Sequence, residues 1–294
     1  METAVFHRLA AAYEPLACRM IKARTPGKTL VAGISGPQGS GKTTAAEVLS
    51  HLLSSRGLCV AVLSLDDLYL PWETRRVYNA TQAGNPYYRI NRGMPGTHDV
   101  NLGCTVIKAL TSAGPGDTTL LPLFDKSCHD GKGDLLPTDR WRPFSGRPDV
   151  LLFEGWMVGF TPLPRPHLEE AARRFPPLAD FNRTHDPAGD FGFLVNGRLA
   201  AYQPLWDLID WLVYLKIPGL HKVLEWRELQ ESRLRQERGT GMSTDEVRAF
   251  VEPYLLFTAA QGLMTLGDLA HSPAKAVVML GEDHYPAELR FPGR

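Results

Sequence analysis

The sequence predicts an α/β fold, a three-layer sandwich in which helices cover both faces of a largely parallel sheet of about five strands. Short apolar runs recur along the chain with helical stretches between them, and the runs are nearly continuous in aliphatic residues, as in strands buried on both faces. Strands that alternate with helices form parallel sheets with right-handed crossovers. The candidate strands are residues 30–35, 58–65, 120–124, 150–153, 211–217 and 276–280.

A helix is expected before the first strand, within residues 1–26. Its apolar residues recur at helical spacing, from Phe6 and Leu9 to Met20. The length of 294 residues suits one large domain or two small ones, and the recurring strands and helices lead us to expect a single domain over residues 1–294.

The overall composition indicates which partners and which cellular compartment to expect. Lys+Arg and Asp+Glu are both 32, so the formal net charge is zero and no global field attracts nucleic acid. No apolar run approaches the roughly 18 residues needed to span a bilayer, so no membrane partner is expected. The four cysteines are far apart and include no C-x-x-C pair, which favours a reducing, cytoplasmic environment. The oligomeric state is left open.

Residues 36–43 (GPQGSGKT) fit the phosphate-binding pattern G-x-x-x-x-G-K-[ST] at every required position. The candidate strand 30–35 precedes them and an apolar-periodic helix, 44–53, follows, which is the context expected of a P-loop. Backbone N–H groups and the helix dipole would hold a polyphosphate there. We therefore expect ATP and Mg²⁺ as cofactors, with Lys42 on the β- and γ-phosphates and the Thr43 hydroxyl on the metal. The expected nucleotide-binding residues are Gly36, Gln38, Gly39, Ser40, Gly41, Lys42, Thr43 and Thr44.

Acidic residues follow two candidate strands, at the edge of the sheet where ligands bind in such folds. Residues 58–65 lead into Asp66 and Asp67, and residues 150–153 lead into Glu154. Asp66 could accept the proton of an acceptor hydroxyl or hold Mg²⁺ through water, and Glu154 could orient the metal. The alternative for each is to cap a helix, a common use of acidic residues.

Residues 71–98 are rich in Asn, Gly, Tyr, Pro and Arg and lack a helical period, which predicts a functional loop for the acceptor substrate. Arg92 and His98 in this loop, and Lys126 after residues 120–124, could bind an anionic or hydroxylated acceptor. A solvated side chain or a surface ion pair is the alternative at each position. Asp99 is expected to cap a helix. The Pro-rich segment 161–195 is interpreted as surface decoration.

A strongly periodic helix is predicted over residues 225–238, within a lid region of residues 218–242. Arg227, Glu231 and Arg235 are four residues apart and therefore share one face. The face is either a ladder of ion pairs or a lid whose arginines reach the transferring phosphoryl group. A capping box at Ser243–Glu246 then predicts a further helix.

Together the segments GPQGSGKTT, LSLDDLY, RGMPGTHD, FDKS, LLFEGWMVGF and EWRELQE…GMS resemble the D-glycerate 3-kinase family, within the P-loop kinases that include uridine kinase and phosphoribulokinase. The resemblance covers about residues 27–286. It implies an ATP-dependent kinase that makes 3-phosphoglycerate from D-glycerate. Asp66 would be the base, Glu154 the metal-site acid, and Arg227 and Arg235 the basic lid. Phe124 stands where this family pattern leads us to expect Tyr.

The residues predicted from these patterns form three groups. The expected catalytic residues are Lys42, Asp66, Glu154, Arg227 and Arg235. The expected acceptor-binding residues are Asp67, Tyr69, Arg92, His98, Asp99 and Lys126. The expected metal ligands are Thr43, Asp66 and Glu154.

Two other functions compete with a kinase for a small hydroxy acid. A P-loop kinase for a nucleoside or a pantothenate-like acceptor could stack its substrate on Trp72, Tyr78, Tyr87 and Tyr88. A non-catalytic ATP-binding protein is the other alternative, which acidic residues at two strand ends disfavour. A GTPase switch is disfavoured because the sequence contains no N-K-x-D motif.

Overall fold

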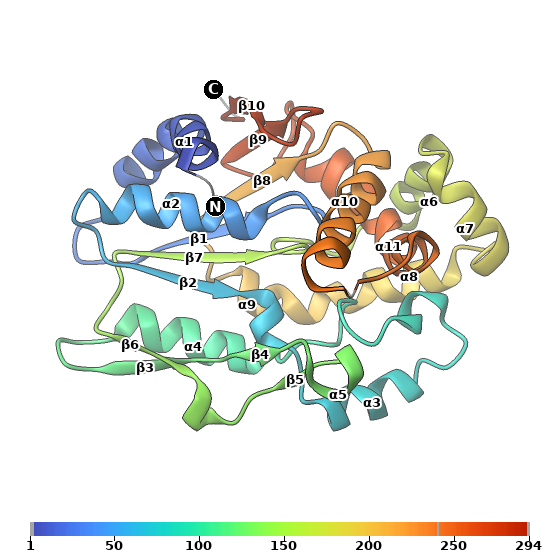
Figure 1. The fold of residues 1–294 in the computed structure, drawn as a ribbon, viewed down its shortest axis with the longest axis horizontal. Helices are drawn as coiled ribbons and strands as arrows, with labels where there is room; N and C mark the ends of the chain where they lie inside the picture. Colours follow the sequence, from blue (N-terminus) through green and yellow to red (C-terminus); the bar gives the residue numbers. More distant parts are fainter. Residues whose placement is uncertain (1–2, 240, 293–294) are drawn as a thin grey trace.

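The computed structural model describes residues 3–239 and 241–292. At its centre is a six-stranded sheet in the order β10-β9-β8-β1-β7-β2 (Figure 1). The strands are β1 (Leu30–Ser35), β2 (Val60–Ser64), β7 (Val150–Gly155), β8 (Trp211–Lys216), β9 (Ala276–Leu280) and β10 (Pro286–Arg290). Five of them pair in parallel, and β10 is an antiparallel edge strand. The predicted largely parallel sheet is confirmed.

The register of the sheet brings three strand ends to one edge. Ser35 of β1 pairs with Gly155 of β7 on one side and Tyr214 of β8 on the other. Ser64, the last residue of β2, pairs with Glu154 of β7. The segments that follow β1, β2 and β7 therefore begin side by side, although more than 80 residues separate the last two in sequence.

Helices cover both faces of the sheet, as expected. Helix α1 (Thr3–Ala23) packs on α2 (Lys42–Ser54) on one side of it, and α2 contacts β1, β2 and β7 (Figure 1). On the other side, Trp206 of the short helix α9 (Gln203–Trp206) lies against Phe153 of β7, with ring centroids 6.2 Å apart. Helix α4 (Val100–Ser112) contacts α9 in the same layer.

The candidate strand at residues 120–124 is not part of the central sheet, which corrects that prediction. Pro122 has no backbone N–H and interrupts the run. The segment instead contributes to two antiparallel ribbons, β3 (Thr118–Leu121) with β6 (Arg142–Ser145) and β4 (Phe124–Asp125) with β5 (Asp134–Leu135). Figure 1 shows both ribbons beyond β2.

Two segments contain more regular structure than the sequence indicated. The predicted loop 71–98 holds α3 (Trp72–Ala80) and a 3₁₀ turn, η2 (Pro86–Arg89). Helix α3 escaped prediction because its buried residue is a charged one, Arg75, which an apolar period cannot detect. The segment 161–195 contains α6 (Arg165–Arg174), α7 (Pro177–His185) and most of α8 (Asp190–Gly197). Since α6 and α7 pack against α11 (Thr244–Phe257), this segment is more than surface decoration.

The remaining elements connect these layers. They are η1 (Leu65–Leu68), α5 (Cys128–Gly131), η3 (Thr138–Arg140), η4 (Arg198–Tyr202), α10 (His221–Arg238) and the π-helix η5 (Thr258–Leu266). The predicted capping box is present at the start of α11, between Ser243 and Glu246. Among the described residues, no helix combines the length and apolar character that crossing a bilayer requires.

Candidate active site

The P-loop forms a tight turn between β1 and α2, as predicted. Gly39 and Gly41 have φ angles of 74° and 83°, a left-handed backbone that other residues adopt at a cost. A Cβ on Gly36 would lie 2.8 Å from Ser40 Oγ and 3.0 Å from Leu215 Cβ, so no larger residue fits there. The turn leaves the N-terminus of α2, which begins at Lys42, without a side-chain cap.

Polar groups in this turn lack partners among the described residues. Ser40 Oγ and Gln38 Oε1 are buried and accept or donate no hydrogen bond within the chain. Lys42 Nζ donates to the carbonyl of Pro37 at 2.8 Å. Burial lowers the pKa of Lys42, and the nearby carboxylates of Glu154 and Asp66 act against that shift. The free Ser40 hydroxyl and the half-buried ammonium of Lys42, at an uncapped helix N-terminus, suit a polyphosphate.

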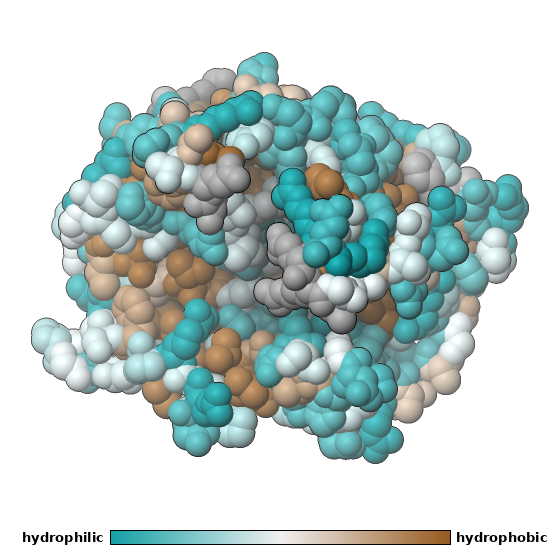
Figure 2. Space-filling view, in the orientation of Figure 1, coloured by the Kyte–Doolittle hydropathy of each residue, from teal (hydrophilic) through white to brown (hydrophobic). Residues whose placement is uncertain are grey.

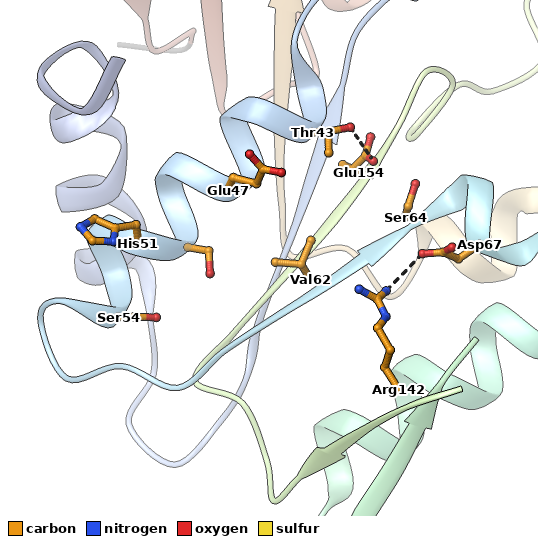
Figure 3. A pocket seen from close by; sticks show the side chains of 10 residues that line it. Thr43, Glu47, His51, Ser54, Val62, Ser64, Asp67, Arg142 and Glu154 are labelled. Atoms are coloured by element: carbon orange, nitrogen blue, oxygen red, sulfur yellow. Dashed lines mark hydrogen bonds and ion pairs between the residues drawn. The ribbon is translucent and has the colours of Figure 1, made fainter. Parts of the chain in front are cut away.

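Thr43 and Glu154 meet where α2 begins and β7 ends. The Thr43 hydroxyl donates to Glu154 Oε1 at 3.2 Å (Figure 3). A hydroxyl and a carboxylate are oxygen donors, and Mg²⁺ in kinase sites takes one or two such ligands together with phosphate oxygens and water. The pair therefore fits the metal that the sequence predicts. The described residues contain no cluster of three His, Cys, Asp or Glu side chains arranged around a cation site.

Asp66 lies on η1, directly after β2, and two side chains hold its carboxylate. Lys126 Nζ donates to Asp66 Oδ2 at 2.6 Å, and the Tyr69 hydroxyl donates to Asp66 Oδ1 at 3.0 Å. Burial alone would raise the pKa of Asp66, but Lys126, His98 and Tyr69 together hold it below its usual value. The group is therefore ionised at neutral pH. The alternative role, capping η1, belongs instead to Ser64, whose hydroxyl accepts from the Asp66 backbone.

Asp67 faces another direction and has other partners. Its Oδ1 accepts the backbone N–H of Phe124 at 3.2 Å, and Arg142 lies 3.3 Å from its Oδ2. Burial raises the pKa of Asp67, opposed by these two contacts. Both partners belong to the antiparallel ribbons, so Asp67 fastens them to the sheet edge.

A cavity of about 580 Å³ lies along α2 beside the edge strand β2. Figure 3 shows Thr43, Glu154, Ser64 and Asp67 at one end, and Glu47, His51 and Ser54 following α2 toward the other. Arg142 reaches into it from β6. The cavity thus opens beside the candidate metal ligands. In the space-filling view of the same side of the molecule, apolar surface lies between α2 and the ribbon of β3 and β6 (Figure 2).

His98 is brought to the same side of the site as Asp66 by an isolated bridge between its backbone and that of Tyr69. The two rings stack with centroids 4.4 Å apart. His98 is 5% exposed, and its Nδ1 lies 2.8 Å from the Tyr202 hydroxyl. Burial lowers the pKa of His98 to about 3, against the attraction of Asp66, so the ring is neutral.

The other predicted acceptor-binding residues differ in their surroundings. Arg92 donates to the carbonyl of Gly131 at 2.7 Å, and its guanidinium lies 5.9 Å from the Phe124 ring, close to Tyr69. Asp99 is the predicted N-cap of α4, with its Oδ1 accepting from Leu102 N at 2.8 Å. A role for Asp99 in substrate binding stays a prediction.

Helix α10 lies against the P-loop through Trp226, whose Cβ is 3.3 Å from the position of a Cβ on Gly39. Arg227 pairs with Glu231 at 2.5 Å, which is the first contact of the predicted i,i+4 ladder. The second contact, between Glu231 and Arg235, is replaced by another ion pair. Arg235 continues along the helix and pairs with Glu228 at 2.8 Å. In this structure both arginines pair with residues of the lid region. Their predicted contact with the transferring phosphoryl group stays a prediction.

Two residues near the site could not be predicted from the sequence around them. Tyr202 is 104 residues from His98, and only the tertiary fold brings them together. His284 stacks on Trp226 with ring centroids 4.1 Å apart and has a left-handed backbone, φ 67°. Its place beside the P-loop depends on β10, the strand that the sequence did not predict.

Comparisons with known proteins identify kinases among the relatives of this chain. No protein-family model matches the chain. It is 35% identical over 265 residues to "Uncharacterized kinase mug58" of Schizosaccharomyces pombe, covering 88% of this chain and 91% of that protein. It is 36% identical over 228 residues to "D-glycerate 3-kinase, chloroplastic" of Arabidopsis thaliana, covering 77% of this chain and 46% of that protein.

A solved structure extends the likeness to the whole fold. The D-glycerate 3-kinase of Cryptococcus neoformans var. grubii superposes with a TM-score of 0.78 at 27% identity, over 99% of this chain and all of the other. The P-loop, the acids at two strand ends and these similarities together assign the family. The chain belongs to the D-glycerate 3-kinase family of P-loop kinases.

Proposed function

We propose that the protein transfers the γ-phosphoryl group of ATP, with Mg²⁺, to the 3-hydroxyl of D-glycerate. The observation that carries the proposal is the Asp66 carboxylate, held ionised between Lys126 and Tyr69 on the segment next to the P-loop. A base in that position can accept the proton of an acceptor hydroxyl. The kinship with two D-glycerate 3-kinases supports this choice of acceptor.

The chain's own residues divide the work. When bound, Mg²⁺–ATP supplies the phosphoryl group and the charge neutralisation that its transfer needs. Lys42 and the P-loop N–H groups would bind the phosphates, and Thr43 and Glu154 would hold the metal. Asp66 would take the proton from the attacking hydroxyl, and Arg227 and Arg235 would stabilise charge on the moving group after a shift of α10.

Basic residues supply the partner for the acceptor's carboxylate. Arg92 presents a planar fork suited to bidentate carboxylate binding, and Lys126 already lies against Asp66. The rings that could stack a nucleoside acceptor are buried or contact other side chains, and Tyr78 packs on Tyr88 with ring centroids 5.7 Å apart. Tyr87 and Tyr88 are 0% and 6% exposed, and Trp72 stacks on His129.

Two experiments test the acceptor. ADP release is measured with D-glycerate, uridine, ribulose 5-phosphate and pantothenate, and phosphorus NMR identifies the product. We expect 3-phosphoglycerate; a nucleoside monophosphate with D-glycerate inert would refute the assignment. Arg92→Lys should lower kcat/KM for D-glycerate while sparing ATP binding. The matched control is Arg76→Lys, since Arg76 forms an exposed pair with Glu73 on α3.

The four cysteines, Cys18, Cys59, Cys104 and Cys128, are all free thiols. Free thiols are typical of a reducing compartment, so we also propose that the protein acts in the cytoplasm.

A further inference from the structure

Of the two ring nitrogens of His98, one has a hydrogen-bond partner among the described residues and the other has none. Nδ1 lies 2.8 Å from the Tyr202 hydroxyl, and Nε2 is buried with no hydrogen-bond partner among the described residues. A buried polar atom without a partner is costly and is uncommon in folded proteins. The ring cannot move away to find water, because it is stacked on Tyr69.

The hydrogen bonds around Tyr202 favour one of the two neutral tautomers of His98. The backbone N–H of Gly96 donates to the Tyr202 oxygen at 2.8 Å. This accepted bond leaves the Tyr202 proton free to be donated, and Nδ1 of His98 lies within reach as its acceptor. A phenol that donates to Nδ1 requires that nitrogen to be unprotonated. A neutral ring then carries its proton on Nε2.

Tyr69 connects His98 to Asp66, the expected base. The Tyr69 ring stacked on His98 ends in the hydroxyl that binds Asp66, and the Asp66 charge acts on His98. The charged groups that influence the ring are Asp66 and Arg75. Because burial keeps the ring neutral, it offers a donor that carries no charge and does not change near neutral pH.

We propose that Tyr202 is a positioning residue that fixes His98 as the Nε2–H tautomer, and that this N–H donates to an oxygen of the acceptor substrate beside Asp66. The ligand class is a small molecule with a hydroxyl or carboxylate oxygen next to the phosphorylated position. Three hydrogen bonds then follow one another. Gly96 N–H donates to the Tyr202 oxygen, the Tyr202 hydroxyl donates to Nδ1 of His98, and Nε2–H of His98 donates to the ligand. The identity of the acceptor rests on the function proposed above; the tautomer does not.

The tautomer is read directly by NMR of protein labelled with nitrogen-15 histidine. The chain has nine histidines, and the signal missing from His98→Gln identifies the one in question. We expect a neutral Nε2–H pattern that does not titrate between about pH 5 and 8, where an ordinary histidine does. Addition of D-glycerate should shift the Nε2 signal. An Nδ1–H pattern, or titration in that range, would overturn the proposal.

Kinetics test the positioning role. Tyr202→Phe removes the hydroxyl and keeps the ring that stacks on Trp206, with centroids 5.6 Å apart. We expect kcat/KM for D-glycerate to fall about tenfold, as for the loss of one hydrogen bond, with KM for ATP unchanged. Tyr214→Phe is the control, because its hydroxyl is also buried but has no hydrogen-bond partner in the part of the chain that the structure describes. An equal kcat/KM in Tyr202→Phe and wild type would overturn the proposal.

The two proposals fail in different ways. If wild type shows the Nε2–H tautomer but does not phosphorylate D-glycerate, the acceptor assignment fails and the tautomer stands. If wild type phosphorylates D-glycerate but the Nε2 signal does not respond to it, the His98 contact fails alone. If Tyr202→Phe does not fold, the wild-type spectra still decide the matter.

Discussion

At the scale of single residues, two carboxylates that are adjacent in sequence have different hydrogen-bond partners and therefore different expected roles. Asp66 bonds to Lys126 and Tyr69, whereas Asp67 bonds to Phe124 N–H and Arg142 of the ribbons. We predict that Asp66→Asn lowers kcat by about 10²–10⁴-fold with little change in ATP affinity. Steady-state kinetics with purified variants measure this. Asp67→Asn is the matched control, and a larger loss of kcat there than in Asp66→Asn would reverse the assignment.

Lys42 offers a second test at this scale. Its side chain is only half-buried and its ammonium bonds to the Pro37 carbonyl, so removing it should not open a cavity in the apolar core. We predict that Lys42→Ala abolishes phosphoryl transfer while its urea unfolding midpoint stays close to that of wild type. The control is the exposed Lys28→Ala. Turnover within about threefold of wild type, a barrier change of only about 0.7 kcal/mol, would sink the phosphate assignment.

At the scale of elements, the segment 71–98, predicted to bind the acceptor, contains glycines whose backbone other residues adopt only at a cost. Gly93 has φ 113°, and a Cβ there would lie 2.0 Å from the Tyr254 hydroxyl of α11. Gly84 shares the left-handed backbone, φ 87°, but a Cβ there meets nothing within 4 Å. We predict that Gly84→Ala costs about 1–2 kcal/mol of unfolding free energy from the backbone alone. Gly93→Ala should cost about 1–3 kcal/mol more from the clash. Urea unfolding of both variants decides it, and equal losses would contradict the clash.

The same elements show how far the sequence leads. Four strands were predictable because they are buried apolar runs, at residues 30–35, 150–153, 211–217 and 276–280. The P-loop motif showed which end of the sheet should hold the nucleotide. Asp66 and Glu154 followed because parallel strands end at one edge. Helix α3 was not predictable, because its buried residue is Arg75, which bonds to the carbonyls of Leu70 and Lys132. Tyr202 was not predictable, since nothing near it in sequence marks its contact with His98.

At the scale of the whole molecule, His98 should make stability depend on pH. Its folded pKa of about 3 lies below the usual value of 6.5, so the unfolded chain binds the proton more tightly. The stability is therefore fully present above about pH 6.5 and is lost as the pH falls toward 3. We predict that wild type loses about 2 kcal/mol more than His98→Gln between about pH 7 and 5. Urea unfolding at both pH values measures the difference, and equal slopes would show that His98 is not buried as described.

The place of β1 in the sheet bears on how the chain folds. Strand β1 is complete at residue 35, yet its two neighbours, β7 and β8, are separated from it by more than 100 residues each. Loop closure over such distances is slow, and during synthesis β1 gains its first neighbour, β7, only at residue 155 and its second, β8, only at residue 216. The nucleotide site is therefore among the last features to assemble. A nucleotide that binds only the finished site cannot guide the search for it. It should instead act as a latch, slowing unfolding while leaving the folding rate unchanged.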